Sequence, residues 1–358
     1  MRHRASDSVK DAEKGREIMR TTLNVGVIGV GWQGEGHVKH YQSFPNVHVA
    51  AIADLDKAKR RKMQAEYGVP STYQDYREML EKEDLDAVSV VTPDHLHLEP
   101  ALAALESGKH VLMEKPLATN VEDAEAIVEA SRRCKRKLMV NFSNRWMSYM
   151  AHTRNAIDAG ELGYPVYAYA RLSNTIYVPT QMLESWSSET ALPFWLMSHT
   201  IDRIRWLFQS EITRVYAASH ASVLTDQGID SPDLFAALVD FENGAIGNFE
   251  SCWILPNTKP SIVDSKMELI FSKGNISIDA QQTTIQKATE AGYAIPGTLQ
   301  MDIYGQPVGF VTEAMRHFVT CVLKDKAPEP SGEDGLAVVR ISAAIIESAQ
   351  TGKPIALV

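Results

Sequence analysis

The first half of the chain alternates between short apolar runs and amphipathic stretches. Five runs are rich in β-branched and other apolar residues: Leu23–Val30, Val47–Ala53, Ala87–Val91, His110–Met113 and Leu138–Asn141. The stretches between them, such as Lys57–Tyr67 and Val121–Cys134, have the period of a helix with one apolar face. Apolar strands separated by helices indicate a parallel sheet that is covered on both faces. We therefore predict a doubly wound α/β domain over residues 23–141.

Beyond residue 141 the predicted strands follow one another with little helix between them: Val166–Ser173, Ile212–Ala218, Leu234–Phe241, Ala245–Ile254, Met267–Phe271 and Asn275–Asp279. Asn243-Gly244 between two of them favours a tight hairpin, because both residue types tolerate positive φ. Two helical patterns, Phe310–Lys324 and Gly335–Gln350, close the chain. This order predicts an α+β domain over residues 142–358 with a largely antiparallel open sheet, whose last helices are free to pack back on the first domain.

Composition and charge narrow the class of protein. The 358 residues are 44% hydrophobic and 23% charged, which is typical of a folded globular chain. The net charge of −9 argues against a nucleic-acid or anionic-membrane partner held by general electrostatics. The longest apolar runs fall far short of the roughly 18 residues that a membrane helix needs. Residues 1–22 lack the apolar segment of a secretory signal and are expected to form a solvated tail.

Cysteine usage bears on metal content and compartment. The three cysteines, Cys134, Cys252 and Cys321, lie far apart and form no C-x-x-C pair. This spacing favours neither a disulfide framework nor a structural zinc site, so no metal is expected. A reducing compartment fits, and we expect a cytoplasmic location.

A glycine-rich motif follows the first predicted strand. It reads Gly29-Val30-Gly31-Trp32-Gln33-Gly34, a G-x-G-x-x-G between a strand and a helix. Glycines allow a tight turn and close approach to a pyrophosphate, and the helix start offers free N–H groups. Asp54 ends the next strand, 20 residues after Gly34, where a carboxylate accepts the ribose hydroxyls of a dinucleotide. The motif predicts a Rossmann domain that binds NAD, with NADP disfavoured by Asp54, although nearby basic residues weaken that inference (Lys57, Lys59, Arg60 and Arg61).

Three further motifs follow in order: Thr92-Pro93-Asp94-His95-Leu96-His97, Gly108-Lys109-His110-Val111 and Glu114-Lys115-Pro116-Leu117-Ala118. With the glycine motif they make the chain resemble the glucose–fructose oxidoreductase/inositol dehydrogenase family (Gfo/Idh/MocA) over about residues 23–355. The resemblance implies hydride transfer between NAD(P) and a secondary alcohol or ketone of a sugar, an inositol or a sugar derivative. It also implies a cis Lys115-Pro116 peptide bond and a cofactor cleft lined by Thr92, Pro93, Asp94, His97, Glu114 and Lys115.

Lys115 is the main candidate for acid–base chemistry. It follows a predicted strand of the parallel sheet at the carboxyl end, where open α/β sheets bind their ligands. A partly desolvated lysine beside an oxidised nicotinamide should have its pKa lowered toward neutrality, so that it can exchange a proton with a substrate hydroxyl. The alternative is a solvated lysine that only pairs with Glu114.

A predicted helix near Phe194–Phe208 carries the second set of candidates. Opposite its apolar face lie Trp195, His199, Asp202, Arg203 and Trp206, a set that fits the wall of a cleft better than a solvated face. The resemblance places His199 and Asp202 on the family's H-x-x-D pattern, in which the histidine assists the lysine in proton transfer. Packing of His199 at a domain or subunit interface is the alternative.

The chain departs from the family pattern at one position. Many members have an aspartate four residues before the histidine, and this chain has Trp195 there. An indole cannot orient an imidazole by accepting a hydrogen bond, so proton relay through His199 is in doubt unless Asp202 substitutes. Trp195 and Trp186 instead offer flat faces to the C–H side of a sugar ring. Arg145, in Asn144-Arg145-Trp146, is the third candidate substrate residue.

The sequence thus predicts an NAD(P)-dependent oxidoreductase that acts on CH–OH groups of a small sugar or polyol. Lys115 would be the acid/base, with His199 and Asp202 beside it. Two alternatives stay open: an NAD-dependent glycosidase that works by oxidation and elimination, and a catalytically silent, nucleotide-sensing protein. An exposed sheet face in the second domain needs cover, so a homo-oligomer, dimer or tetramer, is expected.

Overall fold

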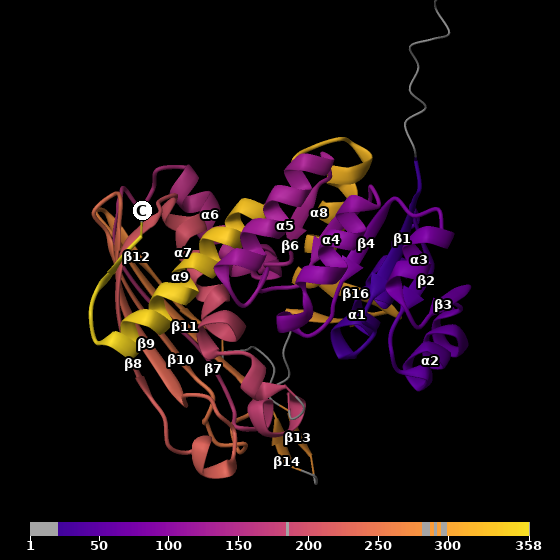
Figure 1. The fold of residues 1–358 in the computed structure, drawn as a ribbon. Coiled ribbons are helices and arrows are strands. Elements are labelled where there is room, and N and C mark those ends of the chain that lie inside the picture. Colours follow the sequence, from indigo (N-terminus) through magenta and orange to yellow (C-terminus); the bar gives the residue numbers. More distant parts are fainter. Residues whose placement is uncertain (1–20, 184–185, 281–286, 290–291, 295–298, 358) are drawn as a thin grey trace, which may run out of the picture.

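The computed structural model of the chain describes residues 21–183, 186–280, 287–289, 292–294 and 299–357. Two β-sheets lie side by side, and a long C-terminal helix runs from the first domain across the second sheet (Figure 1). The predicted tail over residues 1–22 lies outside the described residues except for its last two. All three cysteines are free. No helix in the described ranges combines the length and the apolar composition that crossing a membrane requires.

The first sheet has six parallel strands in the order β3-β2-β1-β4-β5-β6, which confirms the doubly wound prediction. The strands are β1 (Leu23–Ile28), β2 (Val47–Ala53), β3 (Ser71–Tyr73), β4 (Ala87–Val90), β5 (His110–Met113) and β6 (Leu138–Val140). The sequence reading missed β3, because three half-buried residues at a sheet edge carry no apolar run. The connecting helices are α1 (Trp32–Gln42), α2 (Lys57–Tyr67), α3 (Tyr76–Lys82), α4 (Leu98–Glu106) and α5 (Val121–Cys134).

Each face of this sheet has its own apolar core. On one face Leu105 and Ile127, from α4 and α5, pack with Val88 and Val111 of the strands. The cluster on the other face includes side chains of α1, such as Val38, and of the late helix α8 (Phe310–Leu323). Alternate residues of one strand enter different cores, as expected for a strand buried on both sides. A helix from the end of the chain thus completes the core of the first sheet.

The second sheet has seven strands in the order β12-β11-β7-β10-β9-β8-β17. They are β7 (Pro165–Asn174), β8 (Ile212–His220), β9 (Leu234–Phe241), β10 (Ile246–Cys252), β11 (Val263–Phe271), β12 (Gly274–Asp279) and β17 (Ile355–Ala356). All neighbours are antiparallel except β7 and β10, which run parallel. The largely antiparallel prediction is confirmed. Asn243-Gly244 joins β9 to β10 with Gly244 at φ +85°, as the hairpin pattern predicts.

Two small hairpins and several helices complete the second half. The hairpins pair β13 (Lys287–Thr289) with β14 (Gly292–Ala294), and β15 (Gln300–Ile303) with β16 (Gln306–Gly309). The longer helices are α6 (Ser148–Asp158), α7 (Ser198–Phe208), α8 and α9 (Gly332–Thr351). Short helical turns span Asp94–Leu96, Ser143–Trp146, Val178–Met182, Ser187–Glu189, Pro193–Met197 and Thr225–Gln227. The helix predicted from Phe194 is therefore split into a wide turn and α7.

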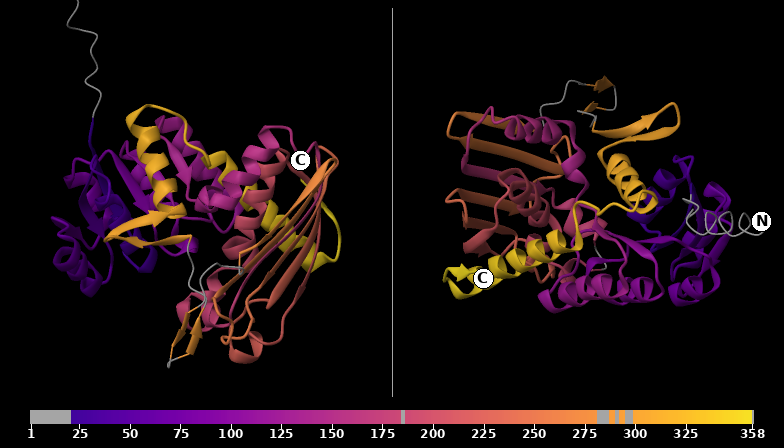
Figure 2. Two further views of the ribbon diagram at one scale, coloured as in Figure 1. Left: turned by 180° about the vertical axis from the view of Figure 1, so that it is seen from behind. Right: turned by 90° about the horizontal axis from the view of Figure 1, so that it is seen from above.

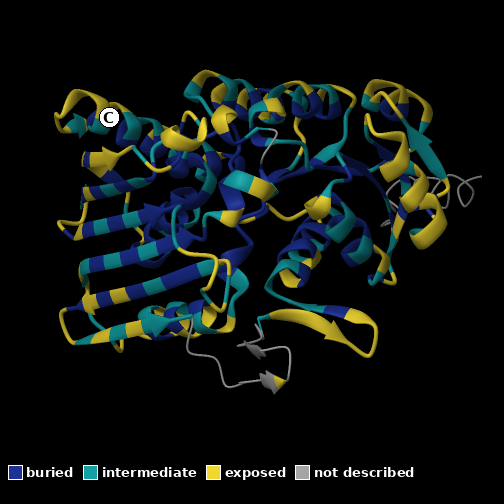
Figure 3. Ribbon diagram, turned by 90° about the horizontal axis from the view of Figure 1, so that it is seen from below, coloured by how far each residue is buried: buried dark blue, intermediate teal, exposed yellow. Residues whose placement is uncertain are grey.

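One face of the second sheet stays open. Figure 3 shows buried positions alternating with intermediate or exposed ones along its strands. Tyr216 and Leu238 are exposed and directly opposite one another on β8 and β9. Ile246 and Ile270 are exposed on either side of Tyr167 in the same row of the sheet. Apolar side chains thus recur across this open face.

Helix α9 connects the two sheets, as both views in Figure 2 show. Its N-terminus is fixed by a capping box in which Ser331 and Asp334 bond each other's backbone. The turn just before it pairs with β6 of the first sheet, through Met139 and Ser331. At the other end Ser348 Oγ accepts a hydrogen bond from the Ala217 N–H on β8 of the second sheet. The helix therefore fixes the spacing of the two domains.

A substitution at Gly34 tests how closely α1 packs on the first sheet. An added Cβ would lie 1.9 Å from the carbonyl oxygen of Gly29, so α1 would have to move. We expect Gly34→Ala to lower the free energy of unfolding by about 2–3 kcal/mol. Gly36→Ala is the matched control, because nothing lies within 4 Å of its added Cβ and alanine favours the helix. Equal midpoints of the two variants in denaturant unfolding would contradict the close packing.

Candidate functional site

A cavity of about 970 Å³ lies at the carboxyl ends of β1, β2, β4 and β5 and extends to the second domain. Of the predicted cofactor residues, all but Gly34 line it: Gly29, Gly31, Trp32, Gln33, Asp54, Thr92, Pro93, Asp94, His97, Glu114 and Lys115. Trp186, Trp195 and His199 line it as well. The structure thus brings residues from both domains to one place, as expected where the order of parallel strands reverses.

The glycine loop at one end of this cavity fits a pyrophosphate. Gly29 has φ +84°, and a Cβ there would lie 2.6 Å from the carbonyl oxygen of Val91. Gly31 has open space where its Cβ would be. No side chain caps the N-terminus of α1, so its first N–H groups are free to meet an anion. Gly34 serves the packing of α1 on β1 rather than the cavity wall.

Asp54 joins two loops beside the glycines. Its carboxylate accepts hydrogen bonds from the backbone N–H of Val30 and of Asp56, both at 2.8 Å. Arg60, one of the basic residues that weaken the NAD inference, donates to the carbonyl oxygens of Asp54 and Leu55 at 2.6 and 3.0 Å. Lys59 lines the cavity. The carboxylate therefore lies at the end of β2 beside the glycine loop, and the guanidinium of Arg60 is engaged by the backbone.

Glu114 is a buried carboxylate with three hydrogen bonds. His37 Nε2 lies 2.9 Å and Asn141 Nδ2 2.7 Å from Oε1, and the Lys115 N–H donates to Oε2 at 3.3 Å. Burial alone would raise the pKa of Glu114, but the contacts with His37 and Asn141 and the charge of Lys115 lower it below its ordinary value. Sequence reasoning missed His37 and Asn141. Only the place of Asn141 just after a parallel strand could have indicated it.

Lys115 points from the first domain to the second. The peptide bond to Pro116 is cis, as the family resemblance predicts. Nζ donates to the carbonyl oxygen of Trp195 at 3.0 Å and lies 3.9 Å from the centre of the indole. Burial lowers the pKa of Lys115 although the charges of Glu114 and Asp94 act in the opposite direction. The ammonium is thus held in place and can lose its proton more readily than a solvated lysine.

The loop after β4 is tied to the cis peptide by His97. Its ring lies between two carbonyl oxygens, Pro116 O at 2.8 Å from Nδ1 and Thr92 O at 3.1 Å from Nε2. Burial lowers the pKa of His97 despite the nearby charge of Asp94. Asp94 in turn accepts a hydrogen bond at 2.6 Å from Thr190 of the second domain, a residue the sequence reading did not identify. These contacts fix the cavity wall between the two strand ends.

His199 contributes an imidazole at the second-domain side. Its Nδ1 is buried and has no hydrogen-bond partner, and its ring lies edge-on to Phe142 at 6.4 Å. Burial and the positive charges of Lys115 and Arg203 hold the pKa of His199 well below its usual range. Both influences favour the neutral form of the imidazole. Trp195, four residues before it, gives it no carboxylate partner.

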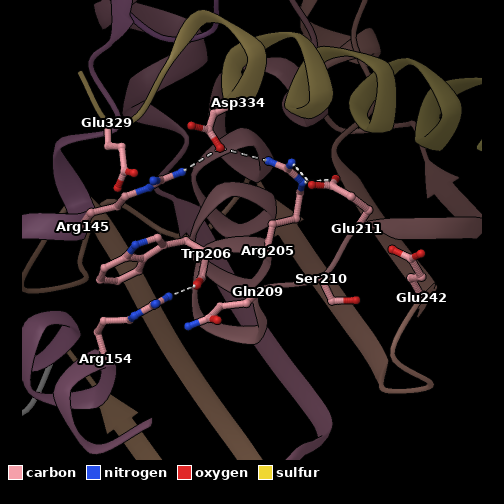
Figure 4. A pocket seen from close by; sticks show the side chains of 10 residues that line it. All are labelled: Arg145, Arg154, Arg205, Trp206, Gln209, Ser210, Glu211, Glu242, Glu329 and Asp334. Atoms are coloured by element: carbon pink, nitrogen blue, oxygen red, sulfur yellow. Dashed lines mark hydrogen bonds and ion pairs between the residues drawn. The ribbon is translucent and has the colours of Figure 1, made fainter. Parts of the chain in front are cut away.

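Asp202 and Arg145 are not at this cavity, contrary to their predicted catalytic and substrate roles. They form a buried bidentate ion pair, Nε to Oδ2 at 3.0 Å and Nη2 to Oδ1 at 2.5 Å. Arg145 borders a second, charged pocket of about 360 Å³, where it reaches Asp334 at 3.4 Å (Figure 4). The physical reason is that Asp202 lies almost one turn beyond His199 on α7, on the side of the 143–146 turn.

The other residues predicted for this face of α7 also lie outside the cavity. Arg203 is buried and donates to the His199 carbonyl oxygen at 3.1 Å. Trp206 and Arg205 line the charged pocket, where Arg205 pairs with Glu211 in bidentate fashion. The prediction that this whole face of the helix lines one cleft is wrong, because α7 is enclosed on nearly all sides. Only its N-terminal part, with Trp195 just before it and His199, reaches the cavity.

Comparison with known proteins gives the same picture of two domains. The family profile described as "Oxidoreductase family, NAD-binding Rossmann fold" (GFO_IDH_MocA) matches residues 23–142. The profile described as "Oxidoreductase family, C-terminal alpha/beta domain" matches residues 154–357. Together the two profiles cover most of the chain.

Similar proteins include several inositol dehydrogenases. The scyllo-inositol 2-dehydrogenase (NAD(+)) of Bacillus subtilis is 28% identical over 346 residues, which cover 95% of this chain and 97% of that protein. Among solved structures, myo-inositol 2-dehydrogenase from Lactobacillus plantarum has a TM-score of 0.83 at 22% identity, over 94% of this chain and 100% of that one. Scyllo-inositol dehydrogenase from Lactobacillus casei, with bound NAD(H) and scyllo-inositol, has a TM-score of 0.81 at 21% identity, over 94% and 99%. The solved structures show a shared fold.

The variant Asp202→Asn tests whether Asp202 holds α7 in place or takes part in catalysis. Loss of the carboxylate leaves the buried guanidinium of Arg145 with its more distant partner Asp334, so we expect the free energy of unfolding to fall by about 2–4 kcal/mol. His199→Asn is the control on the same helix and should change stability by less than about 1 kcal/mol, since Nδ1 makes no hydrogen bond. Denaturant unfolding measures both. Unchanged stability of Asp202→Asn together with lost turnover would instead make Asp202 a catalytic residue.

Proposed function

Because the chain belongs to the Gfo/Idh/MocA family of oxidoreductases, whose first domain is an NAD-binding Rossmann fold, we propose that it is an NAD-dependent dehydrogenase of a sugar, an inositol or a related polyol. The observation that carries the proposal is the ammonium of Lys115, which is held over Trp195 inside a cavity whose glycine loop fits a dinucleotide. Similarity to an NAD-dependent scyllo-inositol dehydrogenase supports the substrate class.

Lys115 is the acid/base of the proposed reaction. When bound, NAD supplies the acceptor for the hydride that leaves the carbon bearing the hydroxyl group. The neutral amine of Lys115 takes the hydroxyl proton as the carbonyl forms, and the ammonium returns it in the reverse direction. Glu114 keeps its negative charge through the reaction, because His37 and Asn141 hold its carboxylate. That charge stabilises the ammonium after the proton has moved.

His199 is the proposed partner of Lys115 in proton transfer. It lies on the same cavity, it is neutral, and its buried Nδ1 has no other partner. Asp202 is withdrawn from the catalytic set in this proposal, since both its carboxylate oxygens bond Arg145. Arg145 is likewise withdrawn as a substrate residue. Trp186 and Trp195 remain the proposed substrate residues.

NAD is the proposed cofactor in preference to NADP. Asp54 lies at the end of β2 with its carboxylate beside the glycine loop, where it accepts ribose hydroxyls and repels a 2′-phosphate. Arg60 is engaged by backbone carbonyl oxygens and is poorly placed to hold that phosphate. Lys59, which also lines the cavity, is the residue that would favour NADP.

A homo-oligomer, dimer or tetramer, and a cytoplasmic location complete the proposal. The open face of the second sheet carries exposed Tyr216, Leu238, Ile246 and Ile270, and a second copy of the chain would cover them. The mass of the protein in solution at micromolar concentration tests this, and a monomer would contradict it. The location rests on the three free cysteines.

Cofactor preference gives a direct test of Asp54. The wild-type protein should bind NAD at least about tenfold more tightly than NADP, the size of one charge-assisted contact plus a repulsion. Asp54→Ser should narrow that gap, because serine keeps one hydrogen bond and removes the charge. Calorimetric titration with each cofactor gives the two dissociation constants. Equal affinities of the wild-type protein would count against the assignment.

Replacing Lys115 tests the proposed reaction. With a substrate found in a panel of inositols, aldoses, sugar acids and glycosides, Lys115→Ala should lower kcat by about 10²–10⁴-fold and leave NAD affinity nearly unchanged. His199→Ala should lower kcat by a smaller factor. The double variant should lower kcat by little more than Lys115→Ala alone. The wild-type rate of oxidation should rise with pH through the pKa of Lys115, which lies below the ordinary 10.5, because the neutral amine is the base.

Three results would change the assignment. A wild-type kcat in Lys115→Ala would exclude the lysine as the base. Cleavage of a glycoside without net NADH would favour an NAD-dependent glycosidase. Tight NAD binding with no turnover of any compound in the panel would favour a nucleotide-sensing protein.

A further inference from the structure

The wall of the cavity that meets Lys115 comes from the second domain and is mainly apolar. Among the described residues, ten from that domain line the cavity, and eight of them are apolar, including Val178, Met182, Leu183, Trp186 and Ile262. They come from segments far apart in the sequence: the residues after β7, the turns that precede α7, and the start of β11. The apolar character therefore belongs to the whole wall and not to one loop.

Among the described residues, the polar side chains of this wall are two, Asn174 and His199. The side-chain nitrogen of Asn174 donates to the carbonyl oxygens of Ile262 at 3.1 Å and of Ser173 at 3.4 Å. Nζ of Lys115 donates to the Trp195 carbonyl oxygen at 3.0 Å. Within the described part of the chain, a ligand thus meets the remaining donors of Lys115, the imidazole of His199 and the amide oxygen of Asn174 on this side.

Two tryptophans form a corner beside the proposed base. The rings of Trp186 and Trp195 meet edge to face with centroids 5.3 Å apart, and His95 lies 6.0 Å from Trp186. One face of Trp195 is covered by the ammonium of Lys115, 3.9 Å from its centroid. The corner offers a ligand flat apolar surface instead of further hydrogen-bonding groups.

A polyol with a hydroxyl group on every ring carbon matches such a wall poorly. Each hydroxyl that is buried against apolar carbon without a partner gives up its hydrogen bonds to water, and affinity falls. An apolar group on the same surface gains affinity in proportion to the area that it removes from water. The wall therefore favours a ligand with few hydroxyl groups on the side that faces the second domain.

We propose that the substrate carries an apolar, ring-sized substituent on the sugar or polyol ring that is oxidised, as a glycoside with an aromatic aglycone does. This inference rests on the dehydrogenase function proposed above. The reacting hydroxyl group lies at Lys115, and the substituent packs against Met182, Trp186 and Ile262. Hydride passes from the hydroxyl-bearing carbon to NAD and the proton to Lys115, so that a ketone, NADH and the intact bond to the substituent remain.

Matched pairs of glycosides test the substrate class. Phenyl and methyl β-glycosides of glucose, galactose and xylose, with free myo-inositol, are assayed for NADH formation with the NAD-loaded protein. For each sugar that turns over, kcat/KM of the phenyl glycoside should exceed that of the methyl glycoside by about tenfold or more. Dissociation constants for the same pairs, measured by calorimetry on the protein loaded with NADH, should differ in the same direction.

A variant of the wall has a matched control elsewhere on the chain. Ile262 is 44% exposed and lines the cavity, so Ile262→Ser should reduce the phenyl-to-methyl ratio by about 3–10-fold without unfolding the protein. Ile303 on β15 is 46% exposed and does not line the cavity, and Ile303→Ser should keep the wild-type ratio. Met182→Ser is a second variant of the wall, expected to act like Ile262→Ser.

The outcomes separate this inference from the proposed function. Equal kcat/KM and equal dissociation constants within each pair, or a preference for free myo-inositol, would overturn the apolar substituent while the dehydrogenase function stands. If no compound yields NADH, the proposed function fails. The dissociation constants of the matched glycosides then test the apolar wall without the activity assay. Tighter binding of phenyl glycosides that Ile262→Ser weakens would still support the apolar wall as a ligand subsite, and equal binding would overturn it.

Discussion

The contact between Lys115 and Trp195 joins the two domains at the cavity. Lys115 follows β5 of the first sheet and Trp195 precedes α7 of the second domain, so one hydrogen bond and one cation–π contact span the interface. A lysine can occupy this buried place because the neighbouring Glu114 is ionised and is itself held by His37 and Asn141. The position of the Lys115 ammonium therefore depends on this electrostatic arrangement.

The two ends of α7 serve different purposes. Its N-terminal end presents His199 to the cavity, while Asp202 and Arg205, farther along, belong to a chain of ion pairs with Arg145, Asp334 and Glu211. Asp334 is also part of the capping box of α9, which spans both sheets. The ion pairs thus fix the helix against the element that sets the domain spacing. Because Nδ1 of His199 has no hydrogen-bond partner, the placement of this residue depends on the anchoring of the helix that carries it.

Local rules account for what could be predicted from the sequence. The strand–glycine–helix pattern and residues that follow parallel strands, such as Asp54, Thr92 and Lys115, depend on near neighbours in the chain, and the structure brings them to one cavity. The failures concern contacts between distant segments. Asp202 follows His199 by three residues in the sequence, yet its partner Arg145 comes from the 143–146 turn. Helical periodicity contains no information on which neighbouring element each side of a buried helix contacts. Two further contacts between distant segments were missed for the same reason: the parallel pairing of β7 with β10 and the hydrogen bond from Thr190 to Asp94.

The apolar wall and the ionisation of Lys115 cannot vary independently. Burial is the largest influence on the pKa of this lysine, and the ring of Trp195, 3.9 Å from Nζ, is part of its surroundings. A wall with more hydroxyl and carboxylate groups would accommodate a more polar ring, but it would also admit water, stabilise the ammonium and raise the pKa of Lys115. A lysine whose pKa is lowered by burial therefore depends on an apolar surrounding. Such a surrounding, in turn, selects substrates that have an apolar side to place against it.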